Sequence, residues 1–142
     1  METKLRVAFA SDDVNEAVEC AKDYLQKNYD FCIGSESDCW PIMASDVSKM
    51  VVEGKADFGV LMCWSGTGTA IAANKIKGIR AATVLDAWTA KGARLWNDAN
   101  VIALSLKRLA PDVIIECLEA FLTTEAPEEA EVETIALLEE LP

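Results

Sequence analysis

The stretch DFGVLMCWSGTGTAIAANK, residues 57–75, decides the fold of this chain. It opens with Phe58–Met62, a nearly continuous apolar run typical of a strand that is buried on both faces of a parallel sheet. Two glycines in Ser65–Gly68 then let the backbone turn sharply, and Ala70–Lys75 consists of good helix formers. The stretch therefore predicts a buried strand, a tight turn and a helix.

This turn could receive an anion. Free N–H groups at the start of the helix would point back at the turn, with Cys63 at its edge. A cysteine at a helix N-terminus can ionise and act as a thiolate. The alternative is that Cys63 is a small buried hydrophobic residue, as most cysteines are, beside a common Gly-x-Gly turn. The motif is neither Gly-x-Gly-x-x-Gly nor a Walker loop, so neither a dinucleotide nor ATP is indicated.

The composition limits the possible classes of protein. The 142 residues are enough for one domain, 1–142, with a substantial core. A net charge of −11 argues against nucleic acid and anionic membranes as partners. We find no membrane-spanning stretch and no N-terminal signal peptide, and therefore expect a cytoplasmic protein. The five cysteines lack metal-ligand spacing and there is no histidine, so we expect no structural zinc, and acid–base chemistry falls to Cys, Asp, Glu or Lys.

Strand-like and helix-like segments alternate along the chain. The expected strands are 5–10, 29–33, 58–62, 79–84 and 99–106. The expected helices are 15–27, 41–53, 69–77, 86–95 and 111–122. This alternation implies βαβ units and a parallel sheet. The last segment, 123–142, is rich in glutamate and then carries apolar residues at rough helical spacing, so we expect it to dock as a helix, with a partner subunit as one candidate receiver.

Asp12 follows the first expected strand, at the edge where open α/β sheets bind their ligands. A simpler role competes with ligand binding, because Ser11, Asp12 or Asp13 could each cap the helix that follows. Only one of them is needed as a cap. The acidic pair therefore suggests a ligand contact without establishing it.

Five segments, in order along the chain, resemble one family of sugar isomerases. They are Ala8–Asp12, Asp57–Cys63 with the Ser-Gly-Thr-Gly turn, Ile71–Lys75, Gly78–Ala82 and Asn97–Leu104. Together they are similar to the ribose-5-phosphate isomerase B and galactose-6-phosphate isomerase family (RpiB/LacAB). The resemblance implies an α/β fold, a Rossmann-like three-layer α/β/α sandwich with a five-stranded parallel sheet. It also implies a homodimer, or a dimer of such dimers, whose sites are shared between subunits.

Members of this family interconvert aldose and ketose sugars, usually as phosphates, through an enediol and without metal or cofactor. The resemblance implies that Cys63 is the base that moves a proton from C2 to C1, whereas another subgroup has an acidic base where this chain has Thr69. By the same likeness Asp12 contacts sugar hydroxyls, and the Thr67 hydroxyl could help to hold the enediolate. The remaining expected substrate-binding residues are Ser11, Asp13, Trp40, Trp64, Ser65, Gly66, Gly68, Thr69, Arg94, Trp96 and Asn97.

The departures from the family pattern concern the substrate. Asp13 and Trp96 stand where the family has histidines. Trp64 replaces a glycine, Trp40 replaces a tyrosine, and glutamates replace a basic C-terminal segment that helps to hold phosphate. Because phosphate needs cationic or N–H donors, we expect a substrate altered from ribose 5-phosphate, either unphosphorylated or anchored differently. The tryptophans would stack on this substrate or fill space in a repacked core.

Two other functions stay open beside the isomerase. Loss of every histidine removes the group credited with opening the sugar ring, which favours a non-catalytic sugar-binding or structural dimer. A weaker third hypothesis is another enolisation reaction, such as epimerisation, on the same scaffold. Exchange of the sugar's C2 proton with solvent separates an enolising enzyme from a binding protein.

Overall fold

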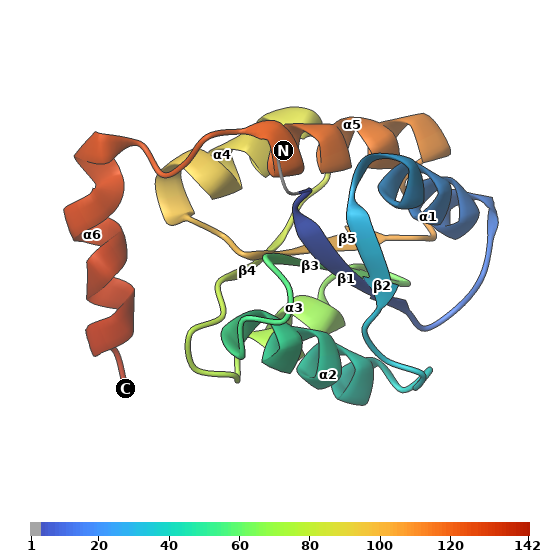
Figure 1. The fold of residues 1–142 in the computed structure, drawn as a ribbon, viewed down its shortest axis with the longest axis horizontal. Helices are drawn as coiled ribbons and strands as arrows, with labels where there is room; N and C mark the ends of the chain where they lie inside the picture. Colours follow the sequence, from blue (N-terminus) through green and yellow to red (C-terminus); the bar gives the residue numbers. More distant parts are fainter. Residues whose placement is uncertain (1–3) are drawn as a thin grey trace.

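A computed structural model describes residues 4–142 and shows a single sheet of five parallel strands (Figure 1). In chain order the strands are β1 (Arg6–Ser11), β2 (Asp30–Ile33), β3 (Phe58–Cys63), β4 (Ala81–Thr83) and β5 (Val101–Ser105). Their order across the sheet is β2-β1-β3-β5-β4, so β3 lies at the centre and β1 and β5 flank it. The strand expected from the opening stretch of the sequence is therefore the middle of the fold.

Helices cover both faces of this sheet (Figure 1). Helices α1 (Glu16–Asn28), α4 (Ala87–Asn97) and α5 (Pro111–Thr123) pack on one face, and α2 (Trp40–Val52) and α3 (Gly68–Ala73) on the other. The three-layer α/β/α sandwich with five parallel strands is confirmed. Among the described residues, 4–142, no helix combines the length and the apolar character that a membrane span requires.

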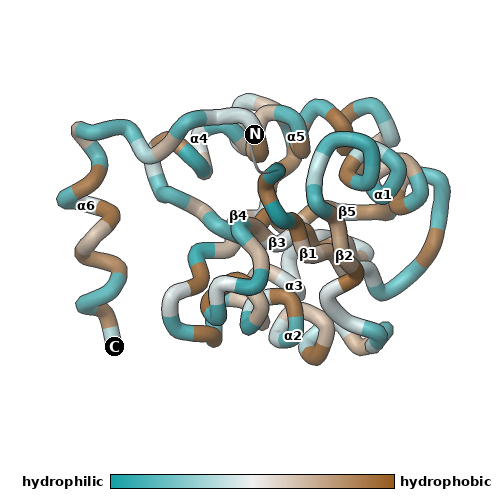
Figure 2. Tube along the Cα trace, in the orientation of Figure 1, coloured by the Kyte–Doolittle hydropathy of each residue, from teal (hydrophilic) through white to brown (hydrophobic). Residues whose placement is uncertain are grey.

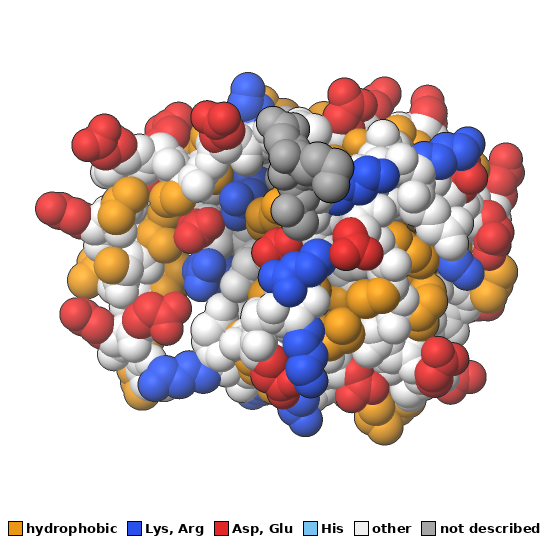
Figure 3. All heavy atoms as spheres, in the orientation of Figure 1, with side chains coloured by type: hydrophobic (Ala, Val, Ile, Leu, Met, Phe, Trp, Pro, Cys, Tyr) orange, Lys and Arg blue, Asp and Glu red, His pale blue; other side chains and the backbone are white. Residues whose placement is uncertain are grey.

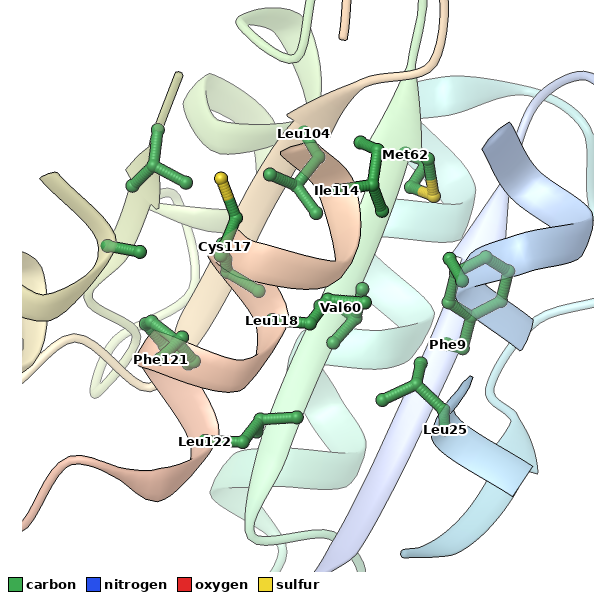
Figure 4. Packing of buried hydrophobic residues seen from close by; sticks show 14 of the residues in the cluster. Phe9, Leu25, Val60, Met62, Leu104, Ile114, Cys117, Leu118, Phe121 and Leu122 are labelled. Carbon is green, nitrogen blue, oxygen red and sulfur yellow. The ribbon is translucent and has the colours of Figure 1, made fainter. Parts of the chain in front are cut away.

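Alternate residues of the central strands feed two separate cores. Phe9 and Val60 point toward the layer of α1, α4 and α5, and Figure 4 shows Phe9 near Leu25 of α1 and Val60 near Leu118 of α5. Ala8 and Leu61, one position along, pack against α2 and α3 instead. This alternation follows from the two-residue period of a strand, and it explains why the strands are apolar along almost their whole length (Figure 2).

The N-cap of α1 shows whether Ser11, Asp12 or Asp13 caps this helix. Helix α1 is capped by Asn15, whose side-chain oxygen accepts a hydrogen bond from the N–H of Val18 at 3.0 Å. None of Ser11, Asp12 and Asp13 has this role, so Asp12 is not needed to start the helix. Proline in the first turn begins α2 and α5 where the sequence predicts it, within one residue.

Two elements are shorter than the sequence predicts, for a shared reason. Helix α3 ends at Ala73 rather than at residue 77, because the Asn74 side chain pairs with the backbone N–H and carbonyl of Ala81. Strand β4 begins only at Ala81, because the N–H of Arg80 bonds to the Asn100 side chain. Side-chain amides thus replace backbone pairing at both element ends.

The C-terminal segment forms three short helical elements, and most of its apolar residues are exposed. It comprises η1 (Glu129–Glu131), α6 (Val132–Ala136) and η2 (Leu137–Glu140), and it stands beside the β4 edge of the sheet (Figure 1). Glu139 lies 3.7 Å from Arg80 and ties the segment to the body. Leu137 and Leu141 are 56% and 66% exposed, so most of its apolar surface has no partner within the described chain.

Candidate active site

The strand order creates one switch point in the sheet, between β1 and β3. The chain leaves β1 toward β2 on one side, whereas β3 and the later strands lie on the other. Asp12 follows β1 and Cys63 ends β3. The N–H of Asp12 donates to the carbonyl of Met62 at 3.2 Å, which holds the two residues side by side. Ligands of open α/β sheets bind at such a point, so the fold places both residues where a ligand would be expected.

Cys63 is held from beneath by Thr69. Its sulfur is 3.3 Å from the Thr69 hydroxyl oxygen, and the cysteine is only 5% exposed. Thr69 is fully buried. The sequence predicts Thr69 as a substrate-binding residue, but the structure places it behind the cysteine, where it can act only through the sulfur. The sequence suggested a ligand contact for Thr69 because this residue lies in the first turn of α3.

The turn between β3 and α3 depends on Gly66. Its φ is +75°, and a Cβ there would lie 2.9 Å from the Leu104 carbonyl carbon and from the Ser105 nitrogen. The Thr83 hydroxyl donates to the Gly66 carbonyl at 2.7 Å and fixes the turn against β4. Gly66 therefore shapes the site by letting the turn approach β5 closely.

Two hydroxyls line the open side of the turn. Ser65 and Thr67 are both exposed, and their oxygens are 2.6 Å apart. The Thr67 N–H also points to the Ser65 oxygen, at 3.4 Å. This hydroxyl pair lies on the same turn as Cys63, so it can donate to an oxygen of a bound ligand.

Asp12 brings an unpaired carboxylate oxygen to the site. Its Oδ1 is buried and has no hydrogen-bond partner among residues 4–142. Burial raises the pKa of Asp12, and the nearby charges of Asp13 and Asp38 raise it further, while a backbone hydrogen bond opposes them. Ser11, at the end of β1, is half-buried, and exposed Asp13 accepts from the N–H of Val14 at 2.8 Å. A ligand hydroxyl would supply the donor that Asp12 lacks.

Two of the three predicted tryptophans lie beside the turn. The Trp40 ring covers Gly68 so closely that a Cβ on Gly68 would be 3.1 Å from it. Trp64 is 58% exposed, and the Lys107 ammonium lies 4.6 Å from the centre of its ring. Trp40 thus forms a wall of the turn, and Trp64 already shares one face with a cation.

Sequence reasoning missed Ser105, which links the turn to the end of β5. Its hydroxyl bonds to the Trp64 carbonyl, and its oxygen accepts from the N–H of Arg108 at 2.9 Å. Ser105 pairs directly with Cys63 in the sheet. A polar residue that ends an otherwise apolar strand was the available signal. Through Ser105, the cations of Lys107 and Arg108 are carried on a segment fixed against the Cys63 turn.

Three expected residues are not brought to this site within one chain. The Arg94 guanidinium is buried 4.7 Å from the centre of the Phe58 ring, at the opposite end of β3, and bonds to Asp98 and to the carbonyl of Ala99. The Trp96 ring packs edge-to-face against Trp88 of the same helix, with ring centres 5.5 Å apart. Asn97 is exposed at the end of α4. Arg94 has a packing role here, and its placement gives no contact with Cys63.

A groove lies on the β4 side of the sheet, beside the C-terminal segment. This groove of about 750 Å³ runs between residues 74–82 and the C-terminal segment, with Asn97 on its rim. The polar side chains of this groove already have partners. The Asn74 amide bonds to the backbone of Ala81, and Arg80 forms ion pairs with Asp98 and Glu139. Figure 3 shows lysines and arginines near the middle of one face of the molecule. We place the chemistry at Cys63 instead, because only there does the structure combine a reactive side chain with an unpaired carboxylate oxygen.

Fold and site together define an α/β sandwich with a cysteine and an aspartate at the switch point of its sheet. The model of the Ribose/Galactose Isomerase family matches residues 7–138, and the chain belongs to this family. The resemblance drawn from the five sequence segments is confirmed.

Relatives and solved structures agree with this assignment. The putative sugar phosphate isomerase YwlF of Bacillus subtilis is 37% identical over 128 residues, which cover 85% of this chain and 86% of that protein. The D-erythrulose-4-phosphate isomerase of Pectobacterium atrosepticum is 36% identical over 109 residues, 72% of each chain. The structure of the type B ribose 5-phosphate isomerase of Trypanosoma brucei superposes with a TM-score of 0.87 at 34% identity, over 97% of this chain and 99% of that one.

Proposed function

We propose that this protein is a sugar-phosphate isomerase that interconverts an aldose and a ketose, with Cys63 as the base. The observation that carries the proposal is the position of Cys63 and Asp12 at the ends of neighbouring strands, joined by the Asp12 N–H to Met62 carbonyl bond. The names of the relatives support the substrate class, because all three act on sugar phosphates by their descriptions.

The reaction follows from the groups present. The Cys63 thiolate takes the proton from C2 of the open-chain aldose, and the electrons of that C–H bond form the C1–C2 double bond. The charge that develops on the C1 oxygen is held by the hydroxyls of Ser65 and Thr67. The sulfur then returns the proton to C1. The proton of the C2 hydroxyl passes to the neighbouring C1 oxygen, so that the C2 oxygen becomes the ketone of the product and the C1 oxygen becomes a hydroxyl. Throughout, Asp12 holds sugar hydroxyls through its otherwise unpaired oxygen.

The sheet order also suggests how the substrate lies. Asp12 comes from β1, on one side of Cys63, and Lys107 and Arg108 follow β5, on the other side. Negative charge from Asp12, Asp13 and Asp38 gathers on the β1 side. A phosphate therefore fits the Lys107 side and the sugar hydroxyls fit the Asp12 side. Because the chain has no histidine and Trp40 covers Gly68, we propose a substrate other than ribose 5-phosphate.

A homodimer is part of this proposal. Asn97 lies away from Cys63 within one chain, yet it begins one of the segments that resemble the family, and Trp96 precedes it where the family has a histidine. A second copy would bring them to the site if the sites are shared between subunits. The exposed apolar side chains of α4 and of the C-terminal segment offer surface for such an assembly.

Proton NMR in D₂O tests the reaction directly. The wild type is incubated with tetroses, pentoses, hexoses and their phosphates, and deuterium uptake at C2 is followed. We expect uptake with one sugar phosphate, reduced at least about 100-fold in Cys63→Ala, because a positioned base contributes that much or more. Cys20→Ala, at a half-buried position of α1, is the matched control and should retain the wild-type rate.

Two results would contradict the proposal. An unchanged exchange rate in Cys63→Ala would show that another group is the base. A folded wild type that exchanges no C2 proton in any of these sugars would refute the isomerase and favour the sugar-binding or structural dimer.

A further inference from the structure

The contact between Cys63 and Thr69 is the most buried polar contact at the site. The cysteine ends the central strand, the threonine lies in the first turn of the following helix, and their side chains meet at 3.3 Å. Thr69 is 0% exposed and Cys63 is 5% exposed. The Thr69 side chain therefore has no solvent-accessible surface, and its hydroxyl contacts the sulfur of Cys63.

The direction of the Thr69 hydroxyl calls for a reason. Thr69 is the second residue of α3, so no helical turn precedes it whose backbone carbonyl its hydroxyl could bond. Within residues 4–142, the sulfur of Cys63 is the partner that the structure gives to this hydroxyl. A valine of the same shape would fill the same space, so packing alone does not require the oxygen.

Other means of stabilising a thiolate are weak here. Helix α3 has only six residues, Gly68–Ala73, so its dipole is small. The nearest fixed cation of the turn, Lys107, lies over the Trp64 ring, and Trp64 points out to solvent. The chain has no histidine to act as a partner. The hydroxyl of Thr69 is the hydrogen-bonding partner that the described residues place on the sulfur.

We propose that Thr69 is a positioning residue for Cys63, with no contact to the substrate. Its O–H donates to the thiolate, which favours the charged form, since hydrogen bonds to charged groups are the strong ones. When the sulfur carries the proton taken from C2, the hydroxyl rotates and accepts from the S–H instead. The sulfur therefore keeps one partner and one orientation while the proton moves from C2 to C1. The activity part of this inference rests on the proposed function, whereas the effect on the thiol does not.

Alkylation of the free protein measures this effect without any sugar. Iodoacetamide labelling is followed for each cysteine by peptide mass spectrometry at one fixed pH, in the wild type and in Thr69→Val and Thr69→Ser. In Thr69→Val, we expect labelling of Cys63 to slow about tenfold, because the attacking sulfur loses its hydrogen-bonding partner. Thr69→Ser keeps the hydroxyl and should stay near the wild type. Cys39, which is exposed, is the internal control and should not change.

The kinetic readout separates positioning from binding. With the sugar identified by NMR, Thr69→Val should lower kcat about tenfold and leave KM within about twofold, because the lost interaction is with the base and not with the sugar. An unchanged Cys63 labelling rate in a folded Thr69→Val protein would overturn the inference, as would a Thr69→Ser protein that behaves like the valine variant. If valine is not accommodated, Thr69→Ala removes the same hydroxyl without adding bulk. Slower labelling of Cys63 in Thr69→Val, together with a wild type that lacks isomerase activity, would uphold the positioning role and refute the proposed function alone.

Discussion

At the scale of single residues, Asp12 and Cys63 differ in whether their buried polar atoms have a hydrogen-bonding partner. The Cys63 sulfur is buried and has a partner in Thr69, whereas Asp12 keeps a buried oxygen with none among the described residues. An unpaired buried carboxylate oxygen costs folding free energy, which a merely structural aspartate would avoid. Asp12 therefore has the character of a residue kept for a ligand at the expense of stability.

Asp12→Asn should make the protein more stable and less active. Burial raises the pKa of Asp12 in the folded protein. Protonated Asp12 therefore contributes its full stability below the ordinary aspartate pKa, and this contribution to the unfolding free energy is lost as the pH rises through the raised pKa. The asparagine variant should thus exceed the wild type in unfolding free energy near pH 7, with the advantage shrinking as the pH falls toward 4. Activity should fall about 10- to 100-fold with loss of a charged acceptor.

Urea unfolding at several pH values checks this prediction, with Asp13→Asn as the control. Asp13 is exposed, so its replacement should change the unfolding free energy by less than about 0.5 kcal/mol at any pH. A stability advantage of Asp12→Asn that grows toward acid would contradict the sign argued here.

The sequence located Cys63 and Asp12 correctly at one edge of the sheet, because both directly follow apolar strands and parallel strands share their carboxyl edge. The inward direction of Thr69 and the packing of Arg94 between Phe58 and Phe121 could not be predicted. Both depend on which residues of distant elements face them, and periodicity within one element carries no such information.

At the scale of elements, the turn between β3 and α3 is the most constrained connection. Gly66 combines a positive φ with contact to the backbone of β5, whereas Gly54 has the same φ of +75° and no atom within 4 Å of its would-be Cβ. Alanine substitutions at these two glycines therefore separate the free-energy cost of backbone strain from that of a steric clash.

Gly54→Ala should reduce the unfolding free energy by about 1 kcal/mol, the cost of a strained φ alone. Gly66→Ala should reduce it by about 3 kcal/mol, because the backbone of Leu104 and Ser105 must also move. Urea denaturation of both variants measures the difference, and isomerase assays should show a loss for Gly66→Ala only. Equal destabilisation would mean that the turn relaxes away from β5 at little cost.

The sequence predicted the order and type of the ten strands and helices of the sandwich, because apolar runs and amphipathic runs alternate without a gap. It overestimated α3 and β4, where Asn74 and Asn100 bond across to Ala81 and Arg80 and end the regular pairing. These asparagines lie far from their partners in the pattern but close in space. Helix and strand ends that are set by side-chain amides cannot be predicted from the local sequence pattern.

At the scale of the whole molecule, one chain does not gather every residue that the family resemblance assigns to the site. Cys63 and Asp12 lie at the carboxyl edge of the sheet, whereas Asn97 precedes β5 and lies at the opposite edge, on the rim of the groove beside the C-terminal segment. Large apolar side chains stay exposed on α4 and on the C-terminal segment, including Trp88 at 71% and Leu141 at 66%. An isologous dimer would cover such surface and supply Asn97 to the partner's Cys63.

Mixing two impaired variants tests whether the sites are shared. Cys63→Ala and Asn97→Ala should each have low activity, the second reduced about tenfold by loss of a substrate contact. In a hybrid dimer, one site receives both substitutions and the other receives neither. After the variants are unfolded together and refolded in equal amounts, half of the dimers are hybrids, so activity should recover to about a quarter of the wild-type value.

Sedimentation velocity on the same samples shows whether dimers form at all. Recovery would establish that Asn97 of one subunit completes the Cys63 site of the other. Activity that merely equals the average of the two variants, in a sample that sediments as a dimer, would place each complete site within one chain. It would then leave Asn97 to the groove beneath the C-terminal segment, where the structure of a single chain has it.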